Sequence, residues 1–571
     1  MAKFRLGINM AGAVSAGAYT AGVLDFLTEA LEEWETTKAA FKAYLANPGP
    51  GPVPPVAPLH DVQIDVFTGA SAGGMCAAIA SVMVQQPFQH IETGDEQNTT
   101  NTFYESWVNK IDISRLLETN DVAGDGPLLS LLDCTIIDEI AGYALTPSGA
   151  TVRRPYIADS LNLFLTLTNA RGTPYGLYTG ATSAEEFVSY YGDRLQFQVT
   201  RGAGGNSPVA PTAKPLPSGQ PGQGAWPLLQ EAAKATGAVP VALASRVLTR
   251  DVADYQIPGW EPLSATSTKI APAFPSGIGA TIQTVNVDGG VTDNTPFELA
   301  DGYLAEQLSQ ASNPSSPDEA NAAVLTVAPF PMGDSNFSGP YVPADHQGIW
   351  AILMSFFNVT LSQSRFLGES LAALMDGSSF SRFAIAPSDP DSVQQGKPAL
   401  QCGSLGAFGG FLCRDFRKHD FLLGRRNCQQ FLREHFAVTA SNPIISGALT
   451  AAGPYAAQIE AQFLTGCPSD NSALPQGKVW MPLIPLCGKA AAEVPLPARA
   501  TIASAQLDNI VNLIVQRLNA IRPKLAVGEL GKLISGAVGI LLNWWIIGGK
   551  VKKAIRQALD NALAGDTAAS S

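Results

Sequence analysis

The sequence predicts an α/β protein with a mainly parallel central sheet between layers of helices, followed by a largely helical C-terminal region. The first observation is that a strand, a turn of small residues and a helix follow one another twice within the first 85 residues, which is typical of parallel α/β sheets. The second is a composition of 46% hydrophobic and 15% charged residues. This composition excludes a wholly disordered chain and indicates large buried layers, a membrane-facing patch, or both.

The individual elements follow from short apolar runs, which predict strands, and from a 3.6-residue apolar period, which predicts helices. Strands are expected at residues 4–8, 62–67, 161–168, 195–200, 281–287 and 324–327. Helices are expected at residues 18–45, 75–84, 228–236, 296–307 and 349–374. Small-residue turns at residues 10–17 and 68–74 join the first two strands to their helices.

These elements place an α/β domain at residues 1–330 and a mainly helical region at residues 331–571. Two segments of the first domain are interpreted as insertions, at about residues 90–150 and 201–224. The former is mainly polar with helical fragments. The latter is rich in glycine and proline, which predicts a surface loop or lid.

The charge balance and the cysteines narrow the function classes. With 36 basic and 49 acidic residues, the chain has a net charge of −13. It therefore has no overall electrostatic attraction for nucleic acid, and no nucleic-acid partner is expected. The seven cysteines contain no C-x-x-C pair, so neither a zinc ribbon nor a dithiol redox motif is offered. We expect reduced thiols in a cytoplasmic protein, with no metal and no organic cofactor.

An uncharged apolar segment lies near the C-terminus, at residues 533–549. As a helix its 17 residues would span about 25 Å, less than a typical hydrocarbon core. A buried helix or helical hairpin is the favoured interpretation. The alternative is a peripheral membrane contact through residues 533–556, with Trp544 and Trp545 at the interface and the following basic residues on anionic headgroups.

The strongest chemical signal is the G-x-S-x-G sequence at residues 69–73, which centres on Ser71. It lies between a predicted strand and a predicted helix, where a serine needs small neighbours because the turn is cramped. Such a turn presents the serine hydroxyl at the start of a helix, whose free N–H groups help to hold a developing oxyanion. The sequence therefore predicts Ser71 as a nucleophile.

Two further motifs follow predicted strands. The small-residue loop at residues 12–17 (GAVSAG) is neither a Walker A loop nor a G-x-G-x-x-G motif. Its exposed amides, at Gly12, Ala13 and Val14, are candidate oxyanion donors beside Ser71. Asp288 closes the strand at residues 281–287, and a carboxylate at the C-terminal end of a parallel strand points to the crevice where α/β active sites lie.

Together these motifs resemble the patatin-like phospholipases, which are serine acyl-hydrolases with a Ser–Asp dyad. The matching residues are 12–17 with Gly-Val-Leu at 22–24, then 69–73, then 232–240 (AAKATGAVP), then Asp-Gly-Gly at 288–290 with Asp-Asn-Thr-Pro at 293–296. The order of the motifs covers about residues 4–330, and residues 406–433 look like a C-terminal element of a large bacterial subgroup. The resemblance implies a three-layer patatin-like core.

The chain also departs from the family pattern. Its first loop lacks two of three glycines and the family arginine, in whose place Ala16 stands. Backbone amides can still act as oxyanion donors there, because alanine and valine also carry an N–H. The interval of 217 residues between Ser71 and Asp288 is long for the family, and we assign the excess to the two insertions.

The resemblance implies a mechanism for cleaving carboxylic esters of lipids, as a phospholipase A or lipid acyl hydrolase. Asp288 acts as the base that removes the proton of Ser71, since a free hydroxyl is a poor nucleophile. Amides near Gly12, Ala13 and Val14 hold the tetrahedral intermediate, and an acyl-serine is then hydrolysed. A lipid or phospholipid is the expected substrate, and the sequence assigns no oligomeric state.

Two alternatives remain open at this point. An α/β-hydrolase would need a Ser–Asp–His triad with a late histidine, for which His346, His419 and His435 are candidates. The second alternative is a catalytically silent, membrane-associated protein with the patatin-like fold, because fold alone does not establish activity.

Overall fold

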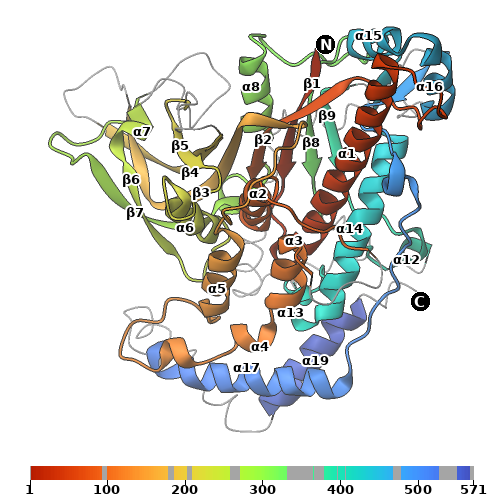
Figure 1. The fold of residues 1–571 in the computed structure, drawn as a ribbon. Helices are drawn as coiled ribbons and strands as arrows, with labels where there is room; N and C mark the ends of the chain where they lie inside the picture. Colours follow the sequence, from red (N-terminus) through yellow and green to blue (C-terminus); the bar gives the residue numbers. More distant parts are fainter. Residues whose placement is uncertain are drawn as a thin grey trace.

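The computed structural model of the protein covers the strands and helices of the predicted core (Figure 1). It describes residues 2–92, 99–177, 186–201, 209–256, 271–330, 364, 379–394, 397–405, 407–466, 477–525 and 550–565. The predicted helix at residues 349–374, apart from Ser364, and the apolar segment at residues 533–549 lie outside the described residues.

Within these residues, nine strands form one mixed sheet, in the order β5-β4-β3-β2-β1-β8-β9 with β7 and β6 attached through β3. They are β1 (Lys3–Met10), β2 (Asp61–Gly69), β3 (Ile157–Leu177), β4 (Glu186–Thr200), β5 (Ala213–Pro217), β6 (Arg246–Asp251), β7 (Thr281–Asp288), β8 (Ala322–Val327) and β9 (Arg382–Ile385). The strands β10 (Ala437–Thr439) and β11 (Trp480–Pro482) form a separate antiparallel pair.

The helices surround the sheet and continue beyond it (Figure 1). The described α-helices are α1 (Gly17–Ala46), α2 (Ser71–Met83), α3 (Thr102–Tyr104), α4 (Ile113–Leu116), α5 (Thr135–Ala144), α6 (Trp226–Thr236), α7 (Val252–Gln256), α8 (Phe297–Gln307), α12 (Pro390–Gln394), α13 (Gly409–Leu412), α14 (Arg414–Glu434), α15 (Pro443–Ala452), α16 (Ala456–Phe463), α17 (Ser504–Leu525) and α19 (Lys550–Gly565). A π-helical segment, Glu105–Lys110, follows α3 directly.

The core of the sheet is parallel, which confirms the predicted fold class. The strands β3, β2, β1, β8 and β9 run in one direction, while β4 and β7 pair antiparallel with β3. The placement of Asp288 on a parallel strand is therefore wrong. The reason is that β7 pairs with β6 and the long β3, and so runs back toward the C-terminal end of β2.

Two apolar layers hold the sheet between helices. On one face, Phe297, Ala300 and Leu304 of α8 pack on Val66 and Val324. On the other face the larger cluster joins α1, α2, α6 and α14 to the remaining apolar side chains of the strands. Burial of these faces is the main favourable term for a sheet of this size.

The helices α1 and α14 lie side by side with almost no space between their backbones (Figure 1). A Cβ at Gly22 of α1 would lie 1.9 Å from the carbonyl oxygen of Phe421. A Cβ at Gly424 of α14 would lie 2.2 Å from the carbonyl oxygen of Tyr19. The Gly-Val-Leu segment at residues 22–24 therefore packs closely against α14. Through this contact the C-terminal region packs directly on the core.

The structure changes the interpretation of one predicted loop. Residues 213–217 form the edge strand β5, parallel to β4, rather than a surface loop or lid. Pro215 and Pro217 lack an N–H and are tolerated because an edge strand leaves one side unpaired. The segment at about residues 90–150 contains α3, the π-helix, α4 and α5.

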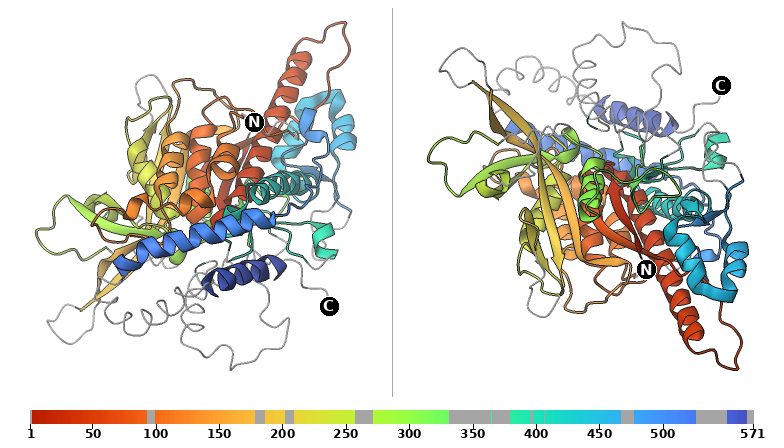
Figure 2. Two further views of the ribbon diagram at one scale, coloured as in Figure 1. Left: turned by 90° about the horizontal axis from the view of Figure 1, so that it is seen from below. Right: turned by 90° about the horizontal axis from the view of Figure 1, so that it is seen from above.

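The last two described helices, α17 and α19, form a layer of their own at one end of the molecule (Figures 1 and 2). Leu507, Ile510 and Val511 of α17 pack with Leu559 of α19 and Leu412 of α13. Within the described stretches, no helix combines the length and the apolarity that a membrane span requires.

Candidate active site

Ser71 lies at the point where β2 turns into α2. The helix begins at Ser71 itself, four residues earlier than predicted. This early start is sterically allowed because Gly73 faces the first strand, where a Cβ would lie 2.1 Å from the carbonyl oxygen of Met10. Ser71 has a φ of +52°, in the left-handed region that non-glycine residues rarely adopt. Strain of this kind clusters at functional sites.

Thr236 supports this strained turn. The backbone N–H of Ser71 donates to Oγ1 of Thr236 at 2.9 Å, and Thr236 is fully buried at the end of α6. A Cβ on the neighbouring Gly74 would lie 2.7 Å from the Thr236 methyl group. Residue 236 belongs to one of the matched motifs, but the motif assigns it no role, because only the fold brings α6 to the turn.

Asp288 and Ser71, predicted separately, are in direct contact. Oγ of Ser71 donates to Oδ2 of Asp288 at 2.6 Å. The other carboxylate oxygen, Oδ1, accepts the backbone N–H of Gly290 at 2.7 Å. Both residues are buried, with 5% of Ser71 and 3% of Asp288 exposed. The geometry therefore unites a hydroxyl and a carboxylate in a site that is largely closed to water.

Burial also sets the protonation of Asp288. Removal from water disfavours the charged carboxylate and raises the pKa of Asp288 to about 7. The hydrogen bonds from Ser71 and from the Gly290 N–H act in the opposite direction, because they stabilise the ionised form. A carboxyl with its pKa near neutrality can exchange a proton with a neighbouring hydroxyl during a reaction.

The small-residue loop at residues 12–17 packs directly against Ser71. A Cβ at Gly12 would lie 2.0 Å from Oδ1 of Asn294 and 2.9 Å from Cβ of Ser71, so only glycine fits there. The N–H of Gly12 donates to the carbonyl oxygen of Asn294 at 3.0 Å. The N–H groups of Ala13 and Val14 donate to no described residue. Val14 has a φ of +47°, so this loop is also strained.

The C-terminal region anchors this loop through Ser15. The Ser15 N–H donates to the carbonyl oxygen of Ala407 at 3.1 Å, and its hydroxyl also donates to that oxygen. The same hydroxyl accepts the N–H of Gly410 at 3.1 Å. Residues almost 400 positions away in the chain thus hold the loop in place, which local sequence patterns do not reveal.

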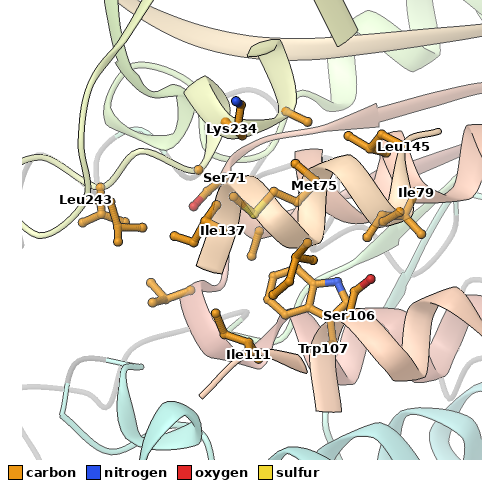
Figure 3. A pocket seen from close by; sticks show the side chains of 18 of the residues that line it. Ser71, Met75, Ile79, Ser106, Trp107, Ile111, Ile137, Leu145, Lys234 and Leu243 are labelled. Atoms are coloured by element: carbon orange, nitrogen blue, oxygen red, sulfur yellow. The ribbon is translucent and has the colours of Figure 1, made fainter. Parts of the chain in front are cut away.

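An apolar pocket opens beside Ser71 (Figure 3). Its volume is about 740 Å³, including the part open to solvent. The lining side chains are mostly aliphatic or aromatic and include Met75, Ile79, Trp107, Ile111, Ile137, Ile140, Ala141, Leu145, Leu243 and Phe411. Many belong to the π-helix and to α5, so the segment at about residues 90–150 forms a wall of the pocket.

The described histidines lie elsewhere, and none of them lines this pocket. His419 contacts Asp420, His90 contacts Asp25, and His60 contacts the carbonyl oxygen of Leu483. His346 is outside the described residues. In the described part of the chain, no group of three or more His, Cys, Asp or Glu side chains is placed to hold a metal ion.

Comparison with known proteins places the chain among related sequences. A sequence model described as patatin-like phospholipase matches residues 9–301. The chain is also 31% identical over 600 aligned positions to the uncharacterized protein y4iI of Sinorhizobium fredii, covering 96% of this chain and 79% of that protein.

Among solved structures, VipD from Legionella pneumophila is similar to this chain at 12% identity, with a TM-score of 0.22 and coverage of 100% of this chain and 92% of that one. A likeness at this level supports no argument about function.

The chain belongs to the patatin-like phospholipase family. This finding confirms the resemblance drawn from the motifs. Membership of the family indicates a lipid acyl hydrolase in general and implies lipid substrates.

The support of Ser71 by Thr236 can be tested by Thr236→Val, which keeps the side-chain shape and removes the acceptor. A buried N–H without a partner costs about 1–3 kcal/mol, so the free energy of unfolding is expected to fall by about this amount. Chemical denaturation measures it. Thr236→Ser retains the hydroxyl and is the matched control. An equal loss of stability in both variants would assign the effect to packing instead.

Proposed function

We propose that the protein hydrolyses carboxylic esters of lipids, with Ser71 as nucleophile and Asp288 as general base. The observation that carries the proposal is the 2.6 Å hydrogen bond between Ser71 Oγ and Asp288 Oδ2 at the edge of an apolar pocket. A dyad of this kind needs the hydroxyl and the base in direct contact. The left-handed φ of Ser71 is the conformation expected of a nucleophile elbow.

In the proposed first step, Asp288 accepts the proton of Ser71 as Oγ attacks the ester carbonyl. The negative charge moves to the carbonyl oxygen, and we assign the N–H groups of Ala13 and Val14 as its donors. Gly12 is not assigned as a donor, because its own N–H is bonded to the carbonyl oxygen of Asn294. Its role is to leave space beside Ser71, since it has no side chain. Collapse of the intermediate breaks the ester bond, and Asp288 returns the proton to the leaving alcohol.

In the proposed second step, Asp288 takes a proton from water, which attacks the acyl-Ser71 carbonyl. The same two amides hold the second oxyanion, and Ser71 leaves with the proton from Asp288 as the fatty acid is released. A pKa near 7 suits this role, because the carboxyl must accept and return a proton in each step.

The pocket supports an acyl chain as the group next to the ester carbonyl. Its lining is apolar along α2, α5 and the π-helix, and Ser71 lies among these side chains (Figure 3). Apolar chains gain roughly 0.8 kcal/mol for each buried CH₂ group. The direct hydrogen bond from Ser71 Oγ to Asp288 Oδ2, with no imidazole between them, favours the dyad over a Ser–Asp–His triad.

The first test compares Ser71→Ala and Asp288→Asn with the wild-type protein on short-chain acyl esters and phospholipids. Each variant is expected to lose about four orders of magnitude or more in kcat/KM, since dyad members act as a unit. Circular dichroism and thermal unfolding check that both variants are folded. A folded variant with full activity would end the dyad assignment.

The second test is the dependence of activity on pH. Asp288 must be ionised to act as a base, and its pKa is raised to about 7. Below pH 7 the carboxyl is protonated, so kcat/KM is expected to fall by about tenfold for each pH unit. The measurement is a pH–rate profile with a hydrolysis-independent check that the fold persists. Constant kcat/KM from pH 7 to pH 5 would contradict the assignment.

The third test narrows the pocket with Ala141→Phe on α5. We expect hydrolysis of hexadecanoyl esters to fall by about tenfold or more relative to butanoyl esters, because the longer chain needs the occupied space. Gly142→Phe is the matched control, since a Cβ there meets nothing within 4 Å. An unchanged chain-length preference in Ala141→Phe would show that the acyl chain lies elsewhere.

A further inference from the structure

A second cavity lies between α1, α14 and residues 489–501, which follow the start of a short 3-10 helix (Gly488–Ala491) and then run beside α14 (Figure 1). Its volume is about 2000 Å³, including the part open to solvent. It shares no lining residue with the pocket at Ser71. One part of its wall is apolar and includes Leu422, Val494 and Leu496, while another part carries charged and polar side chains.

His419 on α14 lines this cavity in a fixed orientation. Its Nδ1 lies 2.8 Å from Oδ1 of Asp420. The Asp420 carboxylate is held by the N–H groups of Gln401 at 2.9 Å and Cys402 at 2.8 Å. His419 is only 2% exposed, and its Nε2 has no partner among the described residues. A buried polar atom of this kind calls for an explanation.

Arg499, on the segment that faces α14, adds a positive charge to the lining of the cavity. Its guanidinium donates to two neutral acceptors, the carbonyl oxygen of Pro398 at 2.7 Å and Oγ of Ser392 at 2.9 Å. No salt bridge joins it to a carboxylate of the described residues. The acidic side chains around the cavity have cationic partners, in the pairs Glu29–Arg425, Glu92–Lys489, Glu493–Arg426 and Asp415–Arg414.

Gln401 connects the two groups. Its backbone N–H donates to Asp420, the partner of His419. Its side chain makes two hydrogen bonds of 2.8 Å with the backbone of Ala500, the neighbour of Arg499. His419 and Arg499 therefore belong to one hydrogen-bonded framework. In this framework, the guanidinium of Arg499 has no carboxylate partner among the described residues. The Nε2 atom of His419 has no hydrogen-bond partner among them either.

We propose that this cavity binds a fatty acid, with its carboxylate at Arg499 and His419 and its chain along Leu422, Val494 and Leu496. A guanidinium presents a planar fork of N–H donors to a carboxylate, and the imidazole Nε2 adds a second polar contact. The choice of a fatty acid, the product of ester cleavage, rests on the proposed function. The cavity and its polar groups do not, so binding can be tested without turnover.

The experiment titrates laurate, below its critical micelle concentration, into the full-length Ser71→Ala protein by isothermal titration calorimetry. Inorganic phosphate and dodecanol are titrated in parallel, because they carry only the anion or only the chain. Laurate is expected to bind at this cavity about tenfold or more tightly than either. Phosphate binding as tight as that of laurate would replace the fatty acid by a free anion and overturn the proposal.

Arg499→Gln identifies which binding event belongs to this cavity. It is expected to weaken one class of laurate sites by about tenfold or more, while any binding in the pocket at Ser71 is unaffected. Arg153→Gln removes the same charge from an exposed pair with Asp159 and is the matched control. Laurate affinities that are equal in Arg499→Gln and the control would overturn the site. Retained hydrolysis in Ser71→Ala would overturn the proposed function but not the site.

Discussion

The pairing of β3 with two strands of opposite direction is the constraint on which the site depends. Gly69, at the end of β2, pairs in parallel with Leu165, and Asp288, at the end of β7, pairs antiparallel with Leu167. The ends of β2 and β7 therefore lie close together, because they pair with residues of β3 that are only two positions apart, Leu165 and Leu167. A slip of one residue in either register would turn the side chains to the other face and separate the hydroxyl from the carboxylate.

The site that results is strained, desolvated and supported from several directions. Ser71 and Val14 both have left-handed φ values, and Asp288 is buried without a cationic partner among the described residues. Such features persist only where the surrounding structure determines them. Here that support comes from the hydroxyl of Thr236, the backbone at Asn294 and the tight packing around Gly12.

The C-terminal region is part of this support. It reaches the first loop through Ser15 and lies along α1 through α14. A buried network joins the two helices, in which Arg425 of α14 bonds to Asp25 and Glu29 of α1. Burial lowers the pKa of His90, but its hydrogen bonds to Asp25 and Glu32 outweigh this effect and raise the pKa to about 9. Removing the Arg425 side chain would leave the carboxylate of Glu29 buried without its cationic partner.

The sequence by itself determined the α/β class, because strand, small-residue turn and helix are local patterns. The order of its motifs determined the family and marked Ser71 and Asp288 as candidate site residues. The antiparallel direction of β7, the edge strand β5, the role of Thr236 and the pocket wall with Trp107 could not be predicted in this way. Each depends on contacts between segments far apart in the chain, which no local pattern encodes. Only the tertiary structure decided that the hydroxyl and the carboxylate share a hydrogen bond, because β3 aligns their strands.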